Sequence, residues 1–422
     1  MTGTEHAPAA PARGSIGLVT ERCFGAIFWG KLLSATGVWV HSITAAIVVY
    51  QMTGSSLMVG LVTVAQFTPQ LLLTPLSGRL TDQGNPVTQI LAGRLVCLFG
   101  SGLLAGWIWL VGEADGVAGA VPVLVCSFVV GLGFVVGGPA MQSIVPSLIR
   151  PGELATAMAL NTLPMTVARV AGPAVGAYVA AHHSPAISFA IAASTHLVFT
   201  VMILLARIPR PERVGTDVDY SVRAAVRYIW LDRPLLMLII GVSAVAFGTE
   251  PTMTLAPSLS SSLGSGQSLV GWLVAAFGAG SGVGFVLHTL TQRRIAMDYL
   301  PCSGLGLMAV GIAASPLTGV PAVAVASFAV AGVGFTYAMT SISTLIQQRS
   351  PEVLRGRVMA LWLVGFVGSR PLAAALDGYL ADTVSLVVAF ATTAALVVVA
   401  AVLCRPSRLR QPAPAADAAN GA

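Results

Sequence analysis

The sequence predicts an all-α membrane protein whose twelve transmembrane helices form two pseudo-symmetric six-helix bundles. Hydrophobic residues make up 55% of the 422 residues and charged residues only 9%, whereas soluble domains contain about 25% charged residues. The apolar residues come in runs of roughly 20, the length that a helix needs to cross the hydrocarbon core of a bilayer. The chain has too few charged side chains to cover a water-soluble fold of this size.

The second observation behind this fold class is an internal duplication. Residues 131–181 align without gaps with residues 332–382. Each copy contains an apolar segment, a short basic loop with Pro and Glu, and a second apolar segment that carries one arginine. The matched residues are Gly131 and Gly133 with Gly332 and Gly334, Met158 with Met359, Arg169 with Arg370, and Tyr178 with Tyr379. The chain is therefore expected to contain one membrane unit twice.

The elements follow in order along the chain. Residues 1–20 are rich in Ala, Pro and Gly and lack a signal-peptide cleavage site, so we expect a disordered cytoplasmic tail. Bundles at 21–206 and 234–404 flank a cytoplasmic linker at 207–233, and residues 405–422 are expected to form a second disordered tail. Twelve spans are predicted near residues 24–49, 57–78, 88–112, 118–143, 155–181, 186–206, 234–256, 268–290, 298–317, 321–345, 357–381 and 383–404.

The positive charges set the expected orientation. Of the 22 Lys and Arg residues, 18 lie in alternate segments that share one side, and the intervening loops contain none. Because basic loops face the cytoplasm, both termini and the linker are expected there, with the bundles in the cell membrane. The basic residues are too dispersed for a nucleic-acid-binding surface.

The linker is expected to contain a helix that lies at the membrane surface. Between residues 219 and 230, Val222, Val226 and Ile229 share one helical face. Arg223 and Arg227 lie on another face. This separation is typical of an interfacial amphipathic helix.

Two short motifs accompany the six-plus-six order of spans. Residues 78–82 (GRLTD) include Gly78 and Asp82 and lie between spans two and three, whereas residues 169–177 (RVAGPAVGA) include Gly172, Pro173 and Gly176 and lie in span five. Proline in a helix removes a hydrogen bond and favours a bend, and glycines four residues apart favour close helix packing. Gating and packing alone are both open readings of the span-five motif.

Together these features resemble the major facilitator superfamily. Residues 32–62 and 225–236 are similar to drug-efflux branches that include multidrug and siderophore (enterobactin-type) exporters. GRLTD resembles the front of the superfamily's loop motif GxLaDRxGRR, and RVAGPAVGA resembles its antiporter motif GPxxGG. The loop motif's arginines are absent here, since Gln83, Asn85, Pro86 and Val87 follow. Val38 stands where this group often has an acidic residue.

The resemblance implies a secondary active transporter that exports a small amphipathic compound, such as a drug, an antibiotic or a related metabolite, by alternating access and in exchange for protons. Export of a siderophore or lipid-like metabolite, and uptake by a permease, are the alternatives. A membrane receptor or enzyme is a remote alternative, because no His/Asp/Glu cluster has catalytic spacing. We expect no cofactor, no metal and no use of ATP, since the glycine-rich residues 278–284 lack the P-loop lysine and suit helix packing.

The charges inside the spans are the candidate functional residues. Arg169 and Arg370 fall near mid-membrane, where an arginine needs a cavity or a partner. They are candidates for binding substrate or for coupling, and structural pairing is the alternative. Arg94 is expected to pair with Asp82 or to face an inner vestibule. Glu250 and Asp377 are candidate proton carriers, and Glu250 is preferred because no basic residue is near it in the sequence. Both lie towards the outer ends of their spans, so an ordinary acid in contact with water is the alternative. Asp377 follows Arg370 by seven residues, so the two could share one helical face.

The remaining candidates are a histidine, a lysine and six aromatic residues. His41 could titrate near neutral pH, although a hydrogen-bonded packing role is the favoured interpretation. Lys31 is expected to extend its ammonium group to the cytoplasmic interface. A cargo cavity is expected to be lined by aromatic side chains, namely Trp39, Phe67, Phe134, Phe247, Trp272 and Phe335.

Overall fold

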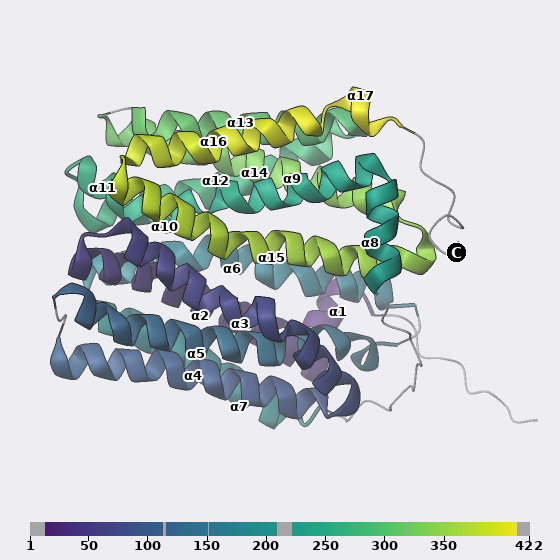
Figure 1. Ribbon diagram of the computed structural model, residues 1–422. Coiled ribbons are helices and arrows are strands. Elements are labelled where there is room, and N and C mark those ends of the chain that lie inside the picture. Colours follow the sequence, from purple (N-terminus) through teal and green to yellow (C-terminus); the bar gives the residue numbers. More distant parts are fainter. Residues whose placement is uncertain (1–12, 113–114, 151, 209–221, 318, 412–422) are drawn as a thin grey trace, which may run out of the picture.

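The computed structural model describes residues 13–112, 115–150, 152–208, 222–317 and 319–411, and its secondary structure there is entirely helical. Figure 1 shows the long helices running side by side through the molecule. The N-terminal half contains α1 (Ser15–Thr20), α2 (Arg22–Thr53), α3 (Ser56–Gln83), α4 (Pro86–Val111), α5 (Gly116–Ser143), α6 (Leu154–His182) and α7 (Pro185–Ala206). The C-terminal half contains α9 (Arg233–Thr249), α10 (Pro251–Thr254), α11 (Ala256–Ser262), α12 (Gly266–Thr291), α13 (Leu300–Ala314), α14 (Pro321–Arg349), α15 (Glu352–Thr383) and α16 (Leu386–Leu403), with α8 (Val222–Leu231) before it and α17 (Pro406–Leu409) after it.

The membrane-spanning helices confirm the predicted fold class. Among the described residues, 11 helices are long and apolar enough to cross a bilayer. The twelfth span is α6, whose 29 residues reach the required length and which packs against α2, α7 and α12. The seventh span is not one helix, because it breaks between α9, α10 and α11. Pro251 is the first residue of α10 and Pro257 is the second residue of α11, where the missing N–H of proline is tolerated.

The two halves meet along two equivalent helix pairs. Figure 1 shows the N-terminal half (purple to blue) beside the C-terminal half (teal to yellow). The main contacts between them are α3 with α15 and α6 with α12. Each pair joins the second span of one half to the fifth span of the other, so the duplication in the sequence also relates the two contacts in space.

Glycines allow the helices of each half to approach closely. A Cβ atom on Gly133 of α5 would lie 2.5 Å from the backbone oxygen of Gly93 in α4. Its duplicate, Gly334 of α14, would place a Cβ 2.3 Å from the backbone nitrogen of Met308 in α13. Only glycine permits these backbone contacts, which is the small-residue packing common between membrane helices.

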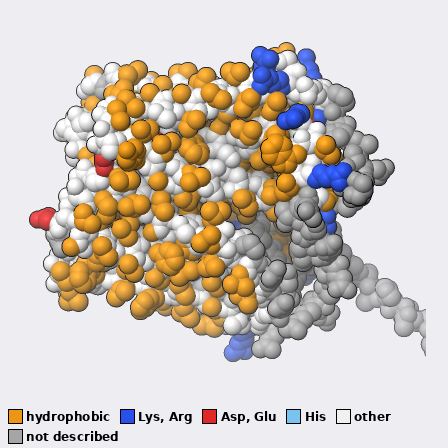
Figure 2. All heavy atoms as spheres, viewed as in Figure 1, with side chains coloured by type: hydrophobic (Ala, Val, Ile, Leu, Met, Phe, Trp, Pro, Cys, Tyr) orange, Lys and Arg blue, Asp and Glu red, His pale blue; other side chains and the backbone are white. Residues whose placement is uncertain are grey.

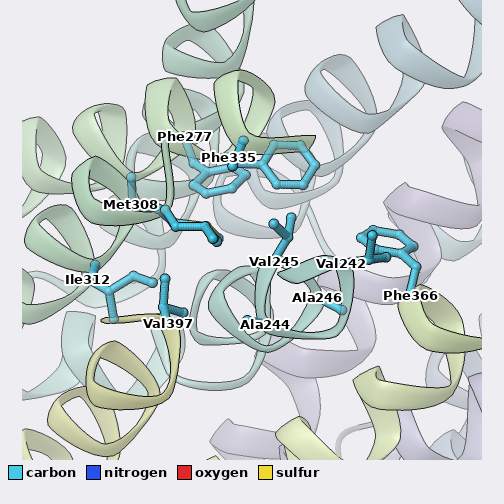
Figure 3. Packing of buried hydrophobic residues seen from close by; sticks show 14 of the residues in the cluster. Val242, Ala244, Val245, Ala246, Phe277, Met308, Ile312, Phe335, Phe366 and Val397 are labelled. Carbon is cyan, nitrogen blue, oxygen red and sulfur yellow. The ribbon is translucent and has the colours of Figure 1, made fainter. Parts of the chain in front are cut away.

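A continuous apolar core fills the C-terminal half. Figure 3 shows Phe277 of α12 and Phe335 of α14 beside Val245 of α9 and Met308 of α13. The two phenyl rings lie 5.6 Å apart, within the range of favourable aromatic pairs. This core supports one wall of the interface between the halves.

Three short helices, α1, α8 and α17, lie at one end of the molecule, which we call the basic end. Figure 1 shows α1, α8 and α17 there, and Figure 2 shows the exposed Lys and Arg side chains of that face towards it, with acidic side chains at the opposite end. The prediction of a disordered tail at 1–20 is wrong for its described part, because residues 15–20 form α1 and Leu18 is buried. Residues 406–409 likewise form α17. Residues 1–12 and 412–422 lie outside the described residues.

The linker contains the expected helix, α8, one side of which packs against the rest of the protein. Ala225, Tyr228 and Ile229 are buried, whereas Val226 is 38% exposed. Tyr228 packs against the bundle and Val226 does not, so the prediction that Val226 belongs to a face at the membrane surface stays a prediction. The side chains of Val222 and Arg223, and residues 209–221 before them, lie outside the description.

Candidate functional site

Two small cavities adjoin the side chain of Trp39, which α2 places between the halves. The first has a volume of about 40 Å³, and its lining includes Phe67 and Phe134. The second has a volume of about 30 Å³, and its lining includes Arg169 of α6 and Arg370 of α15. Each has room for one or two water molecules, so a larger ligand requires movement of the surrounding side chains or helices.

Arg370 forms an ion pair with Glu250 across the C-terminal half. The Nε atom of Arg370 donates a hydrogen bond to Oε1 of Glu250, and the glutamate side chain is fully buried. Glu250 lies at the break between α9 and α10. Such breaks in transporter helices provide polar groups at the centre of the membrane.

Aromatic rings surround the paired arginine. The guanidinium carbon of Arg370 lies 4.2 Å from the ring centre of Phe67 and 5.4 Å from that of Trp39. These rings come from α3 and α2 of the other half, so the cation of one half is solvated by the aromatic faces of the other.

Arg169, the duplicate of Arg370, faces the same cavity and also lies beside Trp39. Its guanidinium carbon lies 5.9 Å from the ring centre of Trp39, 5.5 Å from Phe335 and 5.7 Å from Phe366. No carboxylate within the described residues forms an ion pair with Arg169, and its Nε atom has no hydrogen-bond partner there. The duplication therefore gives one neutralised arginine and one whose charge is balanced only by aromatic rings.

Asp377 does not join this pair. It is buried between α15 and α16 and accepts a hydrogen bond from the hydroxyl group of Thr393. Seven positions along one helix separate Asp377 from Arg370, so the expectation that the two share a polar face stays a prediction. Their hydrogen-bond partners differ, since Arg370 pairs with Glu250 at the break after α9.

The buried histidine of α2 has a packing environment. His41 Nδ1 lies 3.1 Å from Ser101 Oγ and His41 Nε2 lies 3.1 Å from Ser127 Oγ. Its ring also packs edge-on against Phe189. Both ring nitrogens are therefore occupied within the N-terminal half, and His41 does not line either cavity at Trp39.

Arg94 also lies inside the N-terminal half. Its guanidinium group binds Ser34 Oγ, which lies 3.1 Å from Nδ1 of His196, and it lies 6.0 Å from the ring centre of Phe134. The side chain is fully buried, so the prediction that it faces a vestibule is wrong. The side chain of Asp82 lies outside the description.

Lys31 differs from its prediction as well. Its Nζ atom donates to the backbone oxygen of Asn161 at 2.8 Å and to Oδ1 of Asn161 at 2.9 Å. The side chain is 4% exposed. It therefore joins α2 to α6 inside the bundle, because the amide of Asn161 offers two oxygens that replace the water lost on burial.

The predicted aromatic lining divides into three groups. Trp39, Phe67 and Phe134 line the cavities, and Phe335 is buried beside Arg169. Phe247 is half-buried and is not part of either lining. Trp272 is 68% exposed, so the prediction that it lines a cavity is wrong. It lies on the outer surface of α12.

Both motifs lie within helices. A Cβ on Gly172 would lie 2.5 Å from Cβ of Trp39, and a Cβ on Gly176 would lie 2.6 Å from Cγ2 of Ile43, so these glycines pack α6 against α2. Pro173 is buried between them. Gly78 lies in the last turns of α3, which extends past the predicted end of span two to Gln83.

One residue that the sequence did not reveal ties the end of α3 to its neighbours. The side-chain amide of Gln89 in α4 donates to the backbone oxygen of Ser77 at 2.9 Å and to that of Val136 at 2.9 Å. It also accepts from the hydroxyl group of Thr81. A glutamine among apolar residues at the start of α4 was the available signal, since buried amides require partners.

Comparisons with known proteins match nearly the whole length of the chain. A family profile described as transmembrane secretion effector matches residues 14–421. The enterobactin exporter EntS of Salmonella paratyphi A is 25% identical over 419 residues, which cover 95% of this chain and 97% of that protein. EntS of Escherichia coli O157:H7 is 25% identical over 423 residues, with coverage of 96% and 97%.

Solved structures share the fold at low sequence identity. A bacterial homologue of the human lysosomal transporter Spinster, inward-facing and unoccupied, has a TM-score of 0.72 at 15% identity and covers 91% of this chain and 96% of its own. A bacterial homologue of the iron transporter ferroportin has a TM-score of 0.72 in an inward-facing state, at 15% identity with coverage of 92% and 98%. An outward-facing ferroportin homologue has a TM-score of 0.59 at 14% identity, with coverage of 90% and 98%.

Proposed function

The chain belongs to the transmembrane secretion effector family of major facilitator transporters. From this premise we propose that it exports a small organic anion with aromatic or apolar groups, in exchange for protons. The family and its relatives are multi-pass membrane transporters, not enzymes. The relatives named as enterobactin exporters support a siderophore-like cargo over a general drug. The proposed location is the cytoplasmic membrane, with both termini inside.

The unpaired Arg169 is the observation that carries the cargo class. A guanidinium group without a carboxylate partner, facing a cavity between the halves, is an anion-binding group in a low-dielectric surrounding. Its guanidinium carbon lies 5.5 to 5.9 Å from the ring centres of three aromatic residues, Trp39, Phe335 and Phe366. The same rings offer flat apolar surface to the aromatic part of a cargo.

The pair of Arg370 and Glu250 supplies the proposed coupling. When Glu250 is ionised, its carboxylate neutralises Arg370. Exchange requires that the proton and the cargo are not carried together. In the proposed cycle the cargo therefore binds at Arg169 while Glu250 is ionised and paired with Arg370, and Glu250 takes up a proton on the return step without cargo. The proton and the cargo are then coupled through the conformational cycle that both sites share.

The contacts between the halves support alternating access and a state open at the basic end. Near the opposite end, a Cβ on Gly60 would lie 2.3 Å from the backbone oxygen of Ala374, and a Cβ on Gly378 would lie 2.5 Å from that of Ser56. Near the basic end of the same helices, Gly78 and Gly356 would meet nothing within 4 Å. The higher TM-score with inward-facing than with outward-facing structures supports the same state.

Flux into proteoliposomes driven by a pH gradient tests the proposal. Enterobactin and a lipophilic cation of similar size are the two probes. We expect pH-driven movement of enterobactin, reduced about 10- to 100-fold by Arg169→Gln, since a hydrogen bond to a charged group contributes ~1.5–3 kcal/mol. Arg169→Lys keeps the charge and is expected to retain part of the flux.

Two outcomes would contradict parts of this proposal. Equal flux with Arg169→Gln and the unsubstituted protein would remove the anion site. Movement of the lipophilic cation alone would favour drug efflux, a second candidate for which the aromatic rings and the unpartnered Oε2 of Glu250 provide cation-binding groups. Flux that ignores the pH gradient would remove the proton coupling.

A further inference from the structure

A carboxylate from the C-terminal half lies at the start of a helix in the N-terminal half. Asp382, at the end of α15, accepts hydrogen bonds from the backbone nitrogen of Ser56 at 2.8 Å and from that of Leu57 at 3.0 Å. It also accepts from the hydroxyl group of Ser55 at 2.5 Å. These three contacts join residues that are more than 320 positions apart in the sequence.

The contact completes the N-terminus of α3. The first four N–H groups of a helix have no partner within the helix. In α3, counted from the N-cap, Ser55 donates to Thr53 Oγ1 at 3.2 Å and Met58 donates to Ser55 Oγ at 3.1 Å. Ser56 and Leu57 donate to Asp382. Half of the donors that open α3 are therefore satisfied by the other half of the molecule.

The partial charges at the ends of α15 and α3 both favour the contact between Asp382 and the start of α3. The N-terminus of a helix carries a partial positive charge and its C-terminus a partial negative charge. Asp382 lies one residue before the end of α15, where its charge is unfavourable for its own helix. At the start of α3 the same charge is favourable, so the carboxylate gains most when α3 and α15 touch.

Neighbouring residues let this contact form only when the halves are close. Gly378, one helical turn before Asp382, admits the backbone of Ser56 where a Cβ would collide. The hydroxyl groups of Ser56 and Ser258 of α11 lie 2.6 Å apart. Asp382 and Ser55 also line a hollow of about 540 Å³ at the end of the molecule opposite the basic end. Water in this hollow can hydrogen-bond to both side chains when the halves separate.

We propose that Asp382 is a latch that holds the two halves together at the end opposite the basic end, and so biases the transporter towards the state open at the basic end. Its duplicate position in the first half is Ala181, so α6 and α12 lack the equivalent carboxylate. Of the two equivalent helix pairs, α3 with α15 therefore has a carboxylate contact at this end, and α6 with α12 does not. It acts on the conformational equilibrium without cargo, and its test does not depend on which compound is transported.

Distances between spin labels in the full chain, in lipid nanodiscs without cargo, test the latch. One label pair replaces Val117 and Leu317, which are exposed at the opposite end, and a second replaces Leu154 and Ile295 near the basic end. Cys23 and Cys302 are changed to Ser to remove half-buried thiols. In Asp382→Ala we expect the fraction with long distances at the opposite end to rise about tenfold, and the distances at the basic end to shorten.

The control and the second variant keep the result decisive. Asp115→Asn removes an acid at the same end whose side chain caps no helix, and it should leave both distance distributions unchanged. Asp382→Asn keeps one acceptor oxygen and should give a smaller shift than alanine. The latch is overturned if Asp382→Ala and Asp382→Asn, each eluting as the folded protein, give the distributions of the unsubstituted chain, or if Asp115→Asn shifts them equally.

Discussion

Arg13 binds Glu153 through two parallel hydrogen bonds, with Nε to Oε1 at 2.9 Å and Nη2 to Oε2 at 2.8 Å. The contact ties the chain before α1 to the residue that precedes α6, at the basic end. Hydrogen bonds from Arg13, with further ones from the backbones of Arg150 and Arg13, lower the pKa of Glu153 to about 2 from its usual 4.5. Two-pronged pairs of this kind are the stronger form of ion pair.

This pair predicts a pH-dependent difference between the unsubstituted protein and Glu153→Gln. Because the pKa of the folded state is lowered, the carboxylate stabilises the fold fully above about pH 4.5 and loses this effect as the pH falls towards 2. The gap in melting temperature between the two proteins should be constant from pH 7 to 5 and should shrink below 4.5. A gap that widens on acidification would contradict the assigned sign.

The glycines of α12 predict a matched pair of substitutions. A Cβ on Gly280 would lie 2.0 Å from the backbone oxygen of Ala329, whereas a Cβ on Gly282 would meet nothing within 4 Å. Gly280→Ala should destabilise the protein by ~1–3 kcal/mol or more because α12 and α14 must move apart. Gly282→Ala should be neutral or stabilising by up to ~1 kcal/mol, since alanine favours helix. Thermal unfolding in detergent measures both.

The buried pair of Glu250 and Arg370 predicts non-additive substitutions. Removing one partner leaves an unpaired charge, so Glu250→Gln and Arg370→Gln should each cost ~3–5 kcal/mol. The double variant should cost less than the sum of the two, as a double-mutant cycle will show. Asp377→Asn combined with Arg370→Gln is the control. Asp377 bonds to Thr393 and not to an arginine, so the losses of these two variants should add. Additive losses of Glu250→Gln and Arg370→Gln would mean that the ion pair does not couple the two residues.

The two tryptophans of the predicted lining should behave differently in transport. Trp39 contacts both arginines and lines both cavities, so Trp39→Ala should lower the flux at least about tenfold, as expected when a well-packed aromatic anchor is removed. Trp272 is 68% exposed on α12, and Trp272→Ala should leave the flux within about twofold, as is usual for exposed positions. The proteoliposome flux measures both, and equal losses would argue against the cavity at Trp39.

The sequence alone predicted the number and order of the spans and the equivalence of Arg169 and Arg370. These features depend on the length of apolar runs and on internal similarity, which are properties of the linear chain. It could not predict which way a helix faces. Both lipid and protein interior are apolar, so the pattern around α12 did not show that Trp272 lies outside.

Long-range partners were equally hidden. Glu250 was a proton-carrier candidate because no basic residue is near it in the sequence, yet Arg370 lies 120 residues away and binds it. Lys31 was expected at the interface, but Asn161 of another helix supplies two oxygen atoms inside the bundle. Partner choice depends on which helices pack together, and the spacing of residues along one helix carries no information about that.

The tightness of the space around Trp39 has a consequence for ligand discovery. With about 30 to 40 Å³ on either side of the indole, these two cavities admit water and exclude a compound of drug size. A cargo that contacts the indole therefore requires another arrangement of the surrounding residues, and the affinity measured at equilibrium is lowered by the fraction of molecules that adopt that arrangement. Compounds selected to fit the two narrow cavities would not fit the occupied arrangement. Antibodies or lipids that stabilise the occupied arrangement should raise the apparent affinity for the ligand without contacting it.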